Sequence, residues 1–146
     1  MQAFARSLLP VFNVLGYVLL IFAGTMLVPL GVSFVFGETA QKDYDLSLLI
    51  TAAAGGSLLL ATRRFRRELQ PRDGFLLVTL CWTVLPAFAA LPLLLHIHGL
   101  SFTDAYFEAM SGLTTTGATV LSGLDQLPLS INVWRHFLVW LGGMGI

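Results

Sequence analysis

Hydrophobic residues gather in three long stretches that contain no Asp, Glu, Lys or Arg. These stretches are Ser7–Gly37, Leu46–Thr62 and Gly74–Thr103. Because about 20 apolar residues cross a hydrocarbon core roughly 30 Å thick, each stretch can supply one membrane span. The predicted spans cover about Leu8–Phe36, Leu46–Thr62 and Phe75–Leu95, and a further apolar run begins at Ile131.

Prolines and tryptophans add detail to these spans. Pro10 and Pro29 in the first span indicate tilt or a kinked end, because proline cannot donate a helical hydrogen bond. The third span contains Pro86 and Pro92, and such breaks are tolerated where neighbouring groups satisfy the freed backbone. A position in the aromatic belt of a membrane interface is predicted for the two tryptophans of the last run, Trp134 and Trp140.

Two polar segments separate the spans and orient them. The first, Gly37–Asp45, is predicted to be a short polar loop. The second, Arg63–Arg72, contains five of the eight basic residues of the chain. Lys and Arg favour short cytoplasmic loops, so this segment and the N-terminus with Arg6, two crossings away, are predicted to be cytoplasmic. A basic segment can also bind anionic lipid heads or an acidic partner.

The segment between the third span and the last run predicts a short helix followed by irregular backbone. In Ser101–Leu113, either Ser101 or Thr103 can cap the helix N-terminus, and Asp104 falls in the first turn. About 12 residues at 1.5 Å each reach roughly 18 Å, so this helix can descend only partway into a bilayer. The run that follows, Thr114–Thr119, is made of small and hydroxylated residues and is poor as a membrane helix.

This run indicates a backbone that lines an ion path. Irregular backbone at membrane depth is tolerated only where it is buried in protein or lines a watery cavity. Its carbonyl oxygens can replace the water shell of a cation, and Gly117 lets successive carbonyls face one axis. The partially negative C-terminus of the preceding helix favours the same sign of charge. The alternatives are an ordinary Ser/Thr-rich loop or a close contact between helices through small residues.

Three motifs connect the run to a known family. They are Phe107-Glu-Ala-Met-Ser-Gly-Leu-Thr-Thr-Thr-Gly-Ala-Thr119, Trp134-Arg-His136 and Trp140-Leu-Gly-Gly-Met-Gly-Ile146. Together they resemble the first pore unit of Trk-type potassium uptake transporters, and the two preceding spans are similar to the extra helix pair that opens such proteins. The resemblance implies an all-α integral membrane protein. A helix pair, residues 1–72, precedes a unit of helix, re-entrant pore loop and last helix, residues 73–146.

The same resemblance implies a selectivity filter at Thr115, Thr116, Gly117, Ala118 and Thr119. It implies that K⁺ binds at Thr115, Thr116 and Gly117, that no cofactor is needed, and that transport can be coupled to H⁺ or Na⁺. It further implies a multi-pass protein of the cytoplasmic (inner) membrane with a pore loop entered from the outside. Four pore units around one pore, a homodimer and a cytosolic nucleotide-binding regulatory subunit complete the expected system.

One filter run is a quarter of such a pore and cannot enclose an ion. The last apolar run stops at Ile146 without completing a crossing, so the chain is expected to be an N-terminal fragment of a longer transporter with three more loops of this kind. Assembly of four chains is the alternative. A membrane interaction or scaffold module that keeps the pore-unit fold without conducting is the alternative to transport.

Two charged residues fall near the predicted filter. Glu108 lies in the short helix and Arg135 starts the last helix, and a charge at membrane depth is costly unless it is paired or wet. They are expected to pair with each other or with Asp125. Arg135 either braces the filter from behind or extends to the outer interface. Close helix packing or a hinge is predicted at three glycines, Gly142, Gly143 and Gly145.

Composition excludes several other classes of protein. Hydrophobic residues make up 56% of the chain and charged residues 11%, against roughly 25% charged in a soluble domain. A net charge of zero leaves no basic surface for nucleic acid. No Ser, His and Asp set has recognisable spacing, so no enzyme is expected, and Cys81 cannot form an intrachain disulfide. Metal binding is only weakly indicated by the histidines, His96, His98 and His136.

Overall fold

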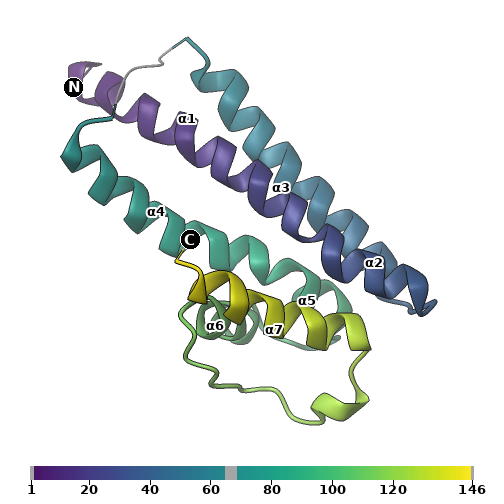
Figure 1. Cartoon of the computed structure of the whole chain (residues 1–146). Helices are drawn as coiled ribbons and strands as arrows, with labels where there is room; N and C mark the ends of the chain where they lie inside the picture. The colour runs from purple at the N-terminus through teal and green to yellow at the C-terminus, as the bar shows by residue number, and fades with distance from the viewer. Residues whose placement is uncertain (1, 65–68, 146) are drawn as a thin grey trace. The chain divides into compact units, whose positions relative to one another are not determined.

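The computed structural model describes residues 2–64 and 69–145, with side chains from residue 8 onward, and every regular element in that part of the chain is helical (Figure 1). The helices are α1 (Gln2–Thr25), α2 (Leu27–Val35), α3 (Gln41–Thr62), α4 (Pro71–Ala89), α5 (Leu91–His96), α6 (Phe102–Leu113) and α7 (Leu129–Gly143), and one 3-10 turn, η1, covers Leu124–Gln126. The all-α prediction is confirmed.

Three helical runs are long and apolar enough to cross a membrane. They are Leu8–Val35, Gln41–Thr62 and Pro71–His96, and they correspond to the three predicted spans. Between 22% and 33% of the residues in their most apolar windows are buried within the chain. Most of the apolar surface of these runs therefore needs lipid or further protein to cover it.

The second span starts earlier than predicted. The polar loop predicted over Gly37–Asp45 is wrong in its second half, because α3 begins at Gln41. Asp43 lies in the first turn of α3, where a carboxylate interacts favourably with the positive end of the helix dipole. Acidic residues in a first turn resemble loop residues in a hydropathy pattern, although they stabilise the helix.

Two of the spans each consist of two consecutive helices. Met26 separates α1 from α2, and Ala90 separates α4 from α5. Pro92 lies at the start of α5, and Pro29 lies near the start of α2. Since proline has no N–H, each of them removes one bond of the helical ladder just after the break.

The chain forms two compact units. The first contains Met1–Thr25 and Leu49–Leu85, and the second contains Met26–Leu48 and Pro86–Ile146. Both α3 and α4 contribute residues to each unit. The domain boundary predicted between residues 72 and 73 stays a prediction.

Small residues bring α1 and α3 together in the first unit. A Cβ on Gly16 would lie 3.1 Å from the carbonyl oxygen of Gly55, and a Cβ on Gly55 would lie 2.9 Å from that of Gly16. The missing side chains let the two backbones approach closely, as small residues do between membrane helices. Nearby, Nδ2 of Asn13 donates to Oγ1 of Thr62 at 2.9 Å, so both buried polar groups are paired.

The second unit is built around α7, which lies beside α6 and α2 (Figure 1). Its core includes Trp134, Ile131 and Leu138, which are 0%, 0% and 1% exposed. Nε1 of Trp134 donates to the carbonyl oxygen of Ala89 at 2.9 Å. The interface position predicted for Trp134 is therefore wrong, because its indole fills the core, whereas Trp140 is 56% exposed.

The predicted basic segment Arg63–Arg72 is only partly described, since residues 65–68 lie outside the described residues. The helix α3 ends at Thr62, and α4 begins with Pro71, a residue favoured at the first helical position. The cytoplasmic placement of this segment and of the N-terminus stays a prediction.

Candidate functional site

The short helix predicted before the filter run is confirmed as α6. Its N-cap is Ser101, whose Oγ accepts a hydrogen bond from the N–H of Asp104 at 3.1 Å and donates to the Asp104 carboxylate at 2.8 Å. Of the two predicted caps, Ser101 and not Thr103 fills the role. Farther along, a Cβ on Gly112 would lie 2.9 Å from Cβ of Leu138, so glycine lets α6 pack closely on α7.

The helix α6 ends in a turn that places a threonine in a strained conformation. The N–H of Thr116 donates to the carbonyl of Ser111 at 2.9 Å, and the N–H of Thr115 donates to that of Gly112 at 2.9 Å. These are the paired bonds of a Schellman C-cap. Thr115 has a φ of 58°, a conformation usually left to glycine and unfavourable for a β-branched residue. Backbone strain is thus stored at the first predicted filter residue.

The remaining predicted filter residues continue from this turn without helix or strand, and residues 114–120 are all exposed. No described residue donates a hydrogen bond to the carbonyl oxygens of residues 115–117. The carbonyl of Ala118, by contrast, accepts one from Oγ of Ser111 at 2.7 Å. Gly117 has a φ of 73° and open space where a Cβ would sit. The segment therefore offers three unpaired main-chain oxygens, and α6 anchors the residue that follows them.

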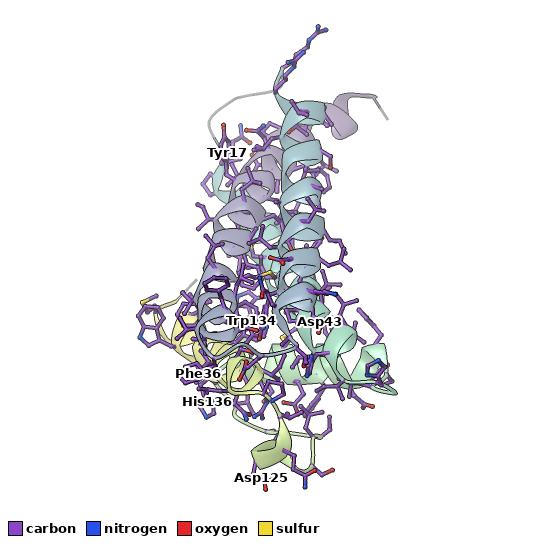
Figure 2. All side chains as sticks on the ribbon, turned by 90° about the vertical axis from the view of Figure 1, so that its right-hand side faces the viewer. Tyr17, Phe36, Asp43, Asp125, Trp134 and His136 are labelled. Atoms are coloured by element: carbon purple, nitrogen blue, oxygen red, sulfur yellow. The ribbon has the colours of Figure 1, made fainter. Side chains whose placement is uncertain are left out.

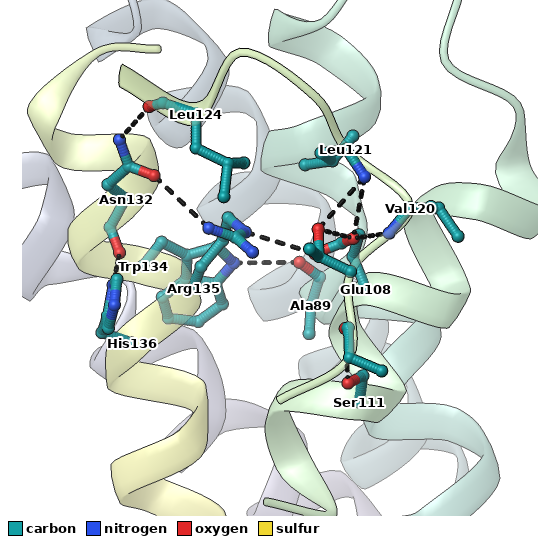
Figure 3. A network of polar contacts seen from close by, with 12 residues as sticks. Ala89, Glu108, Ser111, Val120, Leu121, Leu124, Asn132, Trp134, Arg135 and His136 are labelled. Carbon is teal, nitrogen blue, oxygen red and sulfur yellow. Dashed lines mark hydrogen bonds and ion pairs between the residues drawn. The ribbon is translucent and has the colours of Figure 1, made fainter. Parts of the chain in front are cut away.

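Glu108 on α6 ties the far end of this segment to the helix (Figure 3). Its Oε1 accepts hydrogen bonds from Oγ1 of Thr119 at 2.5 Å and from the N–H groups of Val120 and Leu121 at 2.6 and 3.3 Å. Its Oε2 accepts one from Nε of Arg135 at 3.2 Å. The carboxylate side chain is 2% exposed, so these four donors offset the loss of its water.

Arg135 on α7 completes the network on the other side of Glu108 (Figure 3). Its side chain is 15% exposed. Nη1 of Arg135 donates to Oδ1 of Asn132 at 3.4 Å, and Nδ2 of Asn132 donates to the carbonyl of Leu124 at 2.7 Å. Glu108 and Arg135 therefore pair with each other, which was one of the two predicted pairings. Asp125 is exposed on η1, which projects from the helices of the second unit (Figure 2).

The three predicted glycines of the last helix have different surroundings. A Cβ on Gly142 would lie 1.9 Å from the carbonyl oxygen of Leu113, the last residue of α6. A Cβ on Gly143 would have Cγ2 of Thr115 as its nearest neighbour at 3.8 Å, an ordinary van der Waals contact. Gly145 follows α7 with a φ of 76° and open space around it. Of these three positions, only Gly142 requires glycine for the close contact between α6 and α7.

A small cavity of about 30 Å³ lies behind the segment. Its walls include Ser111 from α6, Arg135 and Val139 from α7, and the backbone of Gly117 and Ala118. A cavity of this size holds about one water molecule. Polar contacts and a small space therefore lie behind the predicted filter.

In the part of the chain that the structure describes, no group of three or more His, Cys, Asp or Glu side chains is placed to hold a metal ion. Nδ1 of His96 lies 2.8 Å from Oδ2 of Asp43. Nδ1 of His136 lies 2.7 Å from the carbonyl oxygen of Asn132, and His98 is exposed. Two of the three histidines thus have partners within the fold.

Sequence reasoning missed several contacts of the site. It did not predict that Ser111 binds the backbone of Ala118, nor that the Glu38 carboxylate accepts hydrogen bonds from the N–H groups of Leu129 and Ser130 at 2.7 and 3.1 Å. The Glu38 contacts join residues 91 and 92 positions apart. The sequence contained one signal for the Glu38 contacts. Pro128 precedes the last helix, and a proline side chain cannot cap a helix, so the first N–H groups of that helix need an acceptor from elsewhere.

Comparison with known proteins places this arrangement in a family. The family model TrkH, described as cation transport protein, matches residues 42–146. The Trk system potassium uptake protein TrkH of Halomonas elongata is 46% identical over 141 residues, and that of Escherichia coli K12 is 42% identical over 135 residues. These alignments cover 96% and 92% of this chain but only 29% and 28% of the two relatives.

A solved structure supports the same family. The crystal structure of the potassium transporter TrkH from Vibrio parahaemolyticus matches all of this chain with a TM-score of 0.86 and 42% sequence identity, and the match covers 30% of the crystallised chain. The chain therefore spans less than a third of the length of these relatives. Since the family model matches well over half of its residues, this chain belongs to the TrkH family of cation transport proteins.

Proposed function

We propose that this chain supplies the first pore unit of a potassium uptake system in the cytoplasmic membrane. In this proposal, residues 115–119 are the selectivity filter, and K⁺ binds at Thr115, Thr116 and Gly117. The observation that carries the proposal is the run of unpaired, exposed carbonyl oxygens directly after a short helix. The relatives named as potassium uptake proteins support potassium as the ion.

The proposed chemistry is coordination without covalent change. Carbonyl oxygens of the filter replace the water molecules around K⁺ as it leaves the outer solution. The helix α6 has 12 residues, about 18 Å, which is too short to cross a bilayer. In this proposal it enters the membrane from the outside, and the filter segment returns toward the same side. Its partially negative C-terminus lies at the filter and favours a cation there.

Glu108 and Arg135 support the filter in this proposal. The carboxylate holds the last filter residue, Thr119, and the two residues after it, Val120 and Leu121. The guanidinium of Arg135 balances the buried negative charge, which would otherwise be costly at membrane depth. Carbonyl dipoles, and not a fixed charge, are then left to select the ion.

Further pore units and partners complete the proposed system. One unit forms one wall of a pore, so three similar units surround the ion together with this one, and lipid covers the apolar outer faces. A homodimer and a cytosolic nucleotide-binding regulatory subunit belong to the same proposal, as does coupling of K⁺ to H⁺ or Na⁺. The N-terminus and Arg63–Arg72 face the cytoplasm.

Rubidium uptake tests the filter in cells that lack their own potassium uptake. The full-length transporter is compared with Gly117→Ser, which forces a side chain onto a φ of 73°. Left-handed backbone costs a residue with a Cβ about 1–2 kcal/mol. Relief of that strain should displace the filter carbonyl oxygens, so the preference for Rb⁺ over Na⁺ should fall. Gly99→Ser is the matched control, because Gly99 has a φ of 84° and equally open surroundings but lies outside the filter.

Unchanged preference in Gly117→Ser would contradict the filter assignment. An equal loss in Gly99→Ser would show that the effect arises from general strain. If the unmodified protein reaches the membrane and takes up no Rb⁺, the non-conducting scaffold is the better interpretation.

A further inference from the structure

Helix α7 begins without a cap of its own. Its N-cap residue is Pro128, whose side chain makes no hydrogen bond, and its first turn contains no acidic residue. The first N–H groups of a helix have no intrahelical partner and need an acceptor from elsewhere. Glu38 supplies it, because Oε1 accepts from the N–H of Leu129 at 2.7 Å and Oε2 from that of Ser130 at 3.1 Å. Its charge also meets the positive end of the helix dipole.

The turn after α2 fixes the backbone of Glu38. The N–H of Glu38 donates to the carbonyl of Ser33 at 2.9 Å, and the N–H of Gly37 donates to that of Phe34 at 3.3 Å. This is a Schellman C-cap, with Gly37 in the left-handed conformation at a φ of 63°. Glu38 is therefore positioned by a helix end and not by a free loop.

Two residues that follow Glu38 hold the same corner of the second unit. Tyr44 is fully buried, and its Oη donates to the carbonyl of Ser130 at 2.9 Å. Asp43 lies 2.8 Å from His96 on α5. Glu38 thus binds the N–H of Ser130 and Tyr44 binds its carbonyl, so both side chains hold the start of α7 in place.

Helix α7 connects this corner to the predicted filter. Arg135 follows Leu129 by about 9 Å along the helix, and it binds Glu108, which in turn binds Thr119 and the residues after it. A displacement of the start of α7 would move Arg135 with it, because a helix transmits displacement as a rigid element.

We infer that Glu38 is a positioning residue for the filter. Through α7 and Arg135 it sets the place of Glu108, and through Glu108 it sets the geometry of the carbonyl oxygens. The inference rests on the proposed filter function of residues 115–119. It gives the α2–α3 corner, which precedes the pore unit in the sequence, a part in ion selection.

The test uses the full-length transporter with Glu38→Ala and Glu38→Gln, in the same potassium-uptake-deficient cells. Asp45→Ala is the control, because Asp45 is an exposed carboxylate on the neighbouring α3. Rb⁺ uptake is measured against increasing Na⁺ at matched abundance in the membrane. Glu38→Ala should lower the preference for Rb⁺ by about threefold or more. Glu38→Gln keeps one acceptor oxygen and should lower it less, and Asp45→Ala should leave it unchanged.

A wild-type preference in both Glu38 variants overturns the inference, whether or not their abundance falls, and leaves Glu38 with a purely structural role. If Glu38→Ala does not reach the membrane, Glu38→Gln and Glu38→Asp decide by the same measurement. Failure of the proposed function has a different signature, because the unmodified protein then shows no preference for Rb⁺ or no uptake.

Discussion

Thr115 and Gly37 occupy the same position in two equivalent turns. Each follows the C-cap residue of a helix and has a positive φ, 58° for Thr115 and 63° for Gly37. Gly37 adopts this conformation without strain, whereas a β-branched residue pays for it with about 1–2 kcal/mol. Strain of this kind is found where a required geometry is held by the surrounding structure. At Thr115 the surrounding structure is the end of α6.

Thr115→Gly should therefore raise the thermal midpoint of the purified full-length protein, by an amount equivalent to about 1 kcal/mol. The matched variant is Thr116→Gly, because Thr116 has no positive φ. Glycine there adds backbone entropy to the unfolded chain and removes the hydrogen bond between the Thr114 and Thr116 hydroxyls, which are 2.8 Å apart. Thr116→Gly should lower the midpoint. Equal midpoints for the two variants would show that Thr115 is not strained.

Residue chemistry alone predicted part of the candidate site. The cost of an unpaired charge at membrane depth predicted that Glu108 and Arg135 would have partners. Side-chain chemistry narrowed the helix cap to Ser101 or Thr103, of which the structure has Ser101. The bonds from Glu108 to Val120 and Leu121 were not predictable in this way, because they use main-chain groups that every residue carries. Their selection depends on the path of the backbone.

Among the helices, α6 and α7 approach most closely at Gly142. The carbonyl of Leu113 would lie 1.9 Å from a Cβ on Gly142. Gly142→Ala should force the two helices apart and destabilise the second unit by about 1–3 kcal/mol. Gly143→Ala, one residue farther along, meets only an ordinary contact and should be neutral or stabilising, since alanine favours helix by roughly 0.5–1 kcal/mol.

Thermal unfolding and membrane abundance of the two alanine variants provide the measurement. A Gly142→Ala protein as stable as Gly143→Ala would mean that α7 can shift at little cost, which favours a hinge over close packing at this position.

Element boundaries show where hydropathy patterns are informative and where they are not. The long apolar runs predicted three spans because lipid requires them. The pattern failed at the start of α3, where Asp43 favours the helix while lowering hydropathy. It also failed at Trp134, because interface and core both suit an indole, and only the contact with Ala89 distinguishes them.

For the whole molecule, orientation in the membrane can be read from cysteine labelling. In a Cys81→Ser background, Asp125→Cys should react with a membrane-impermeant maleimide in intact cells, because Asp125 is exposed on η1 and η1 belongs to the predicted outer side. Arg64→Cys is equally exposed and should react only after the cells are permeabilised, because basic segments favour the cytoplasm. Labelling of Arg64→Cys in intact cells would reverse the proposed topology.

The corner at residues 38–44 has a consequence for how the protein is made. The binding partners of Glu38 follow it by 91 and 92 residues, and that of Tyr44 follows by 86. At about 5 to 20 residues per second, translation separates these partners by roughly 5 to 18 s. Throughout that interval Glu38 and Tyr44 have been synthesised but their partners on α7 have not, so both side chains need other partners until α7 arrives.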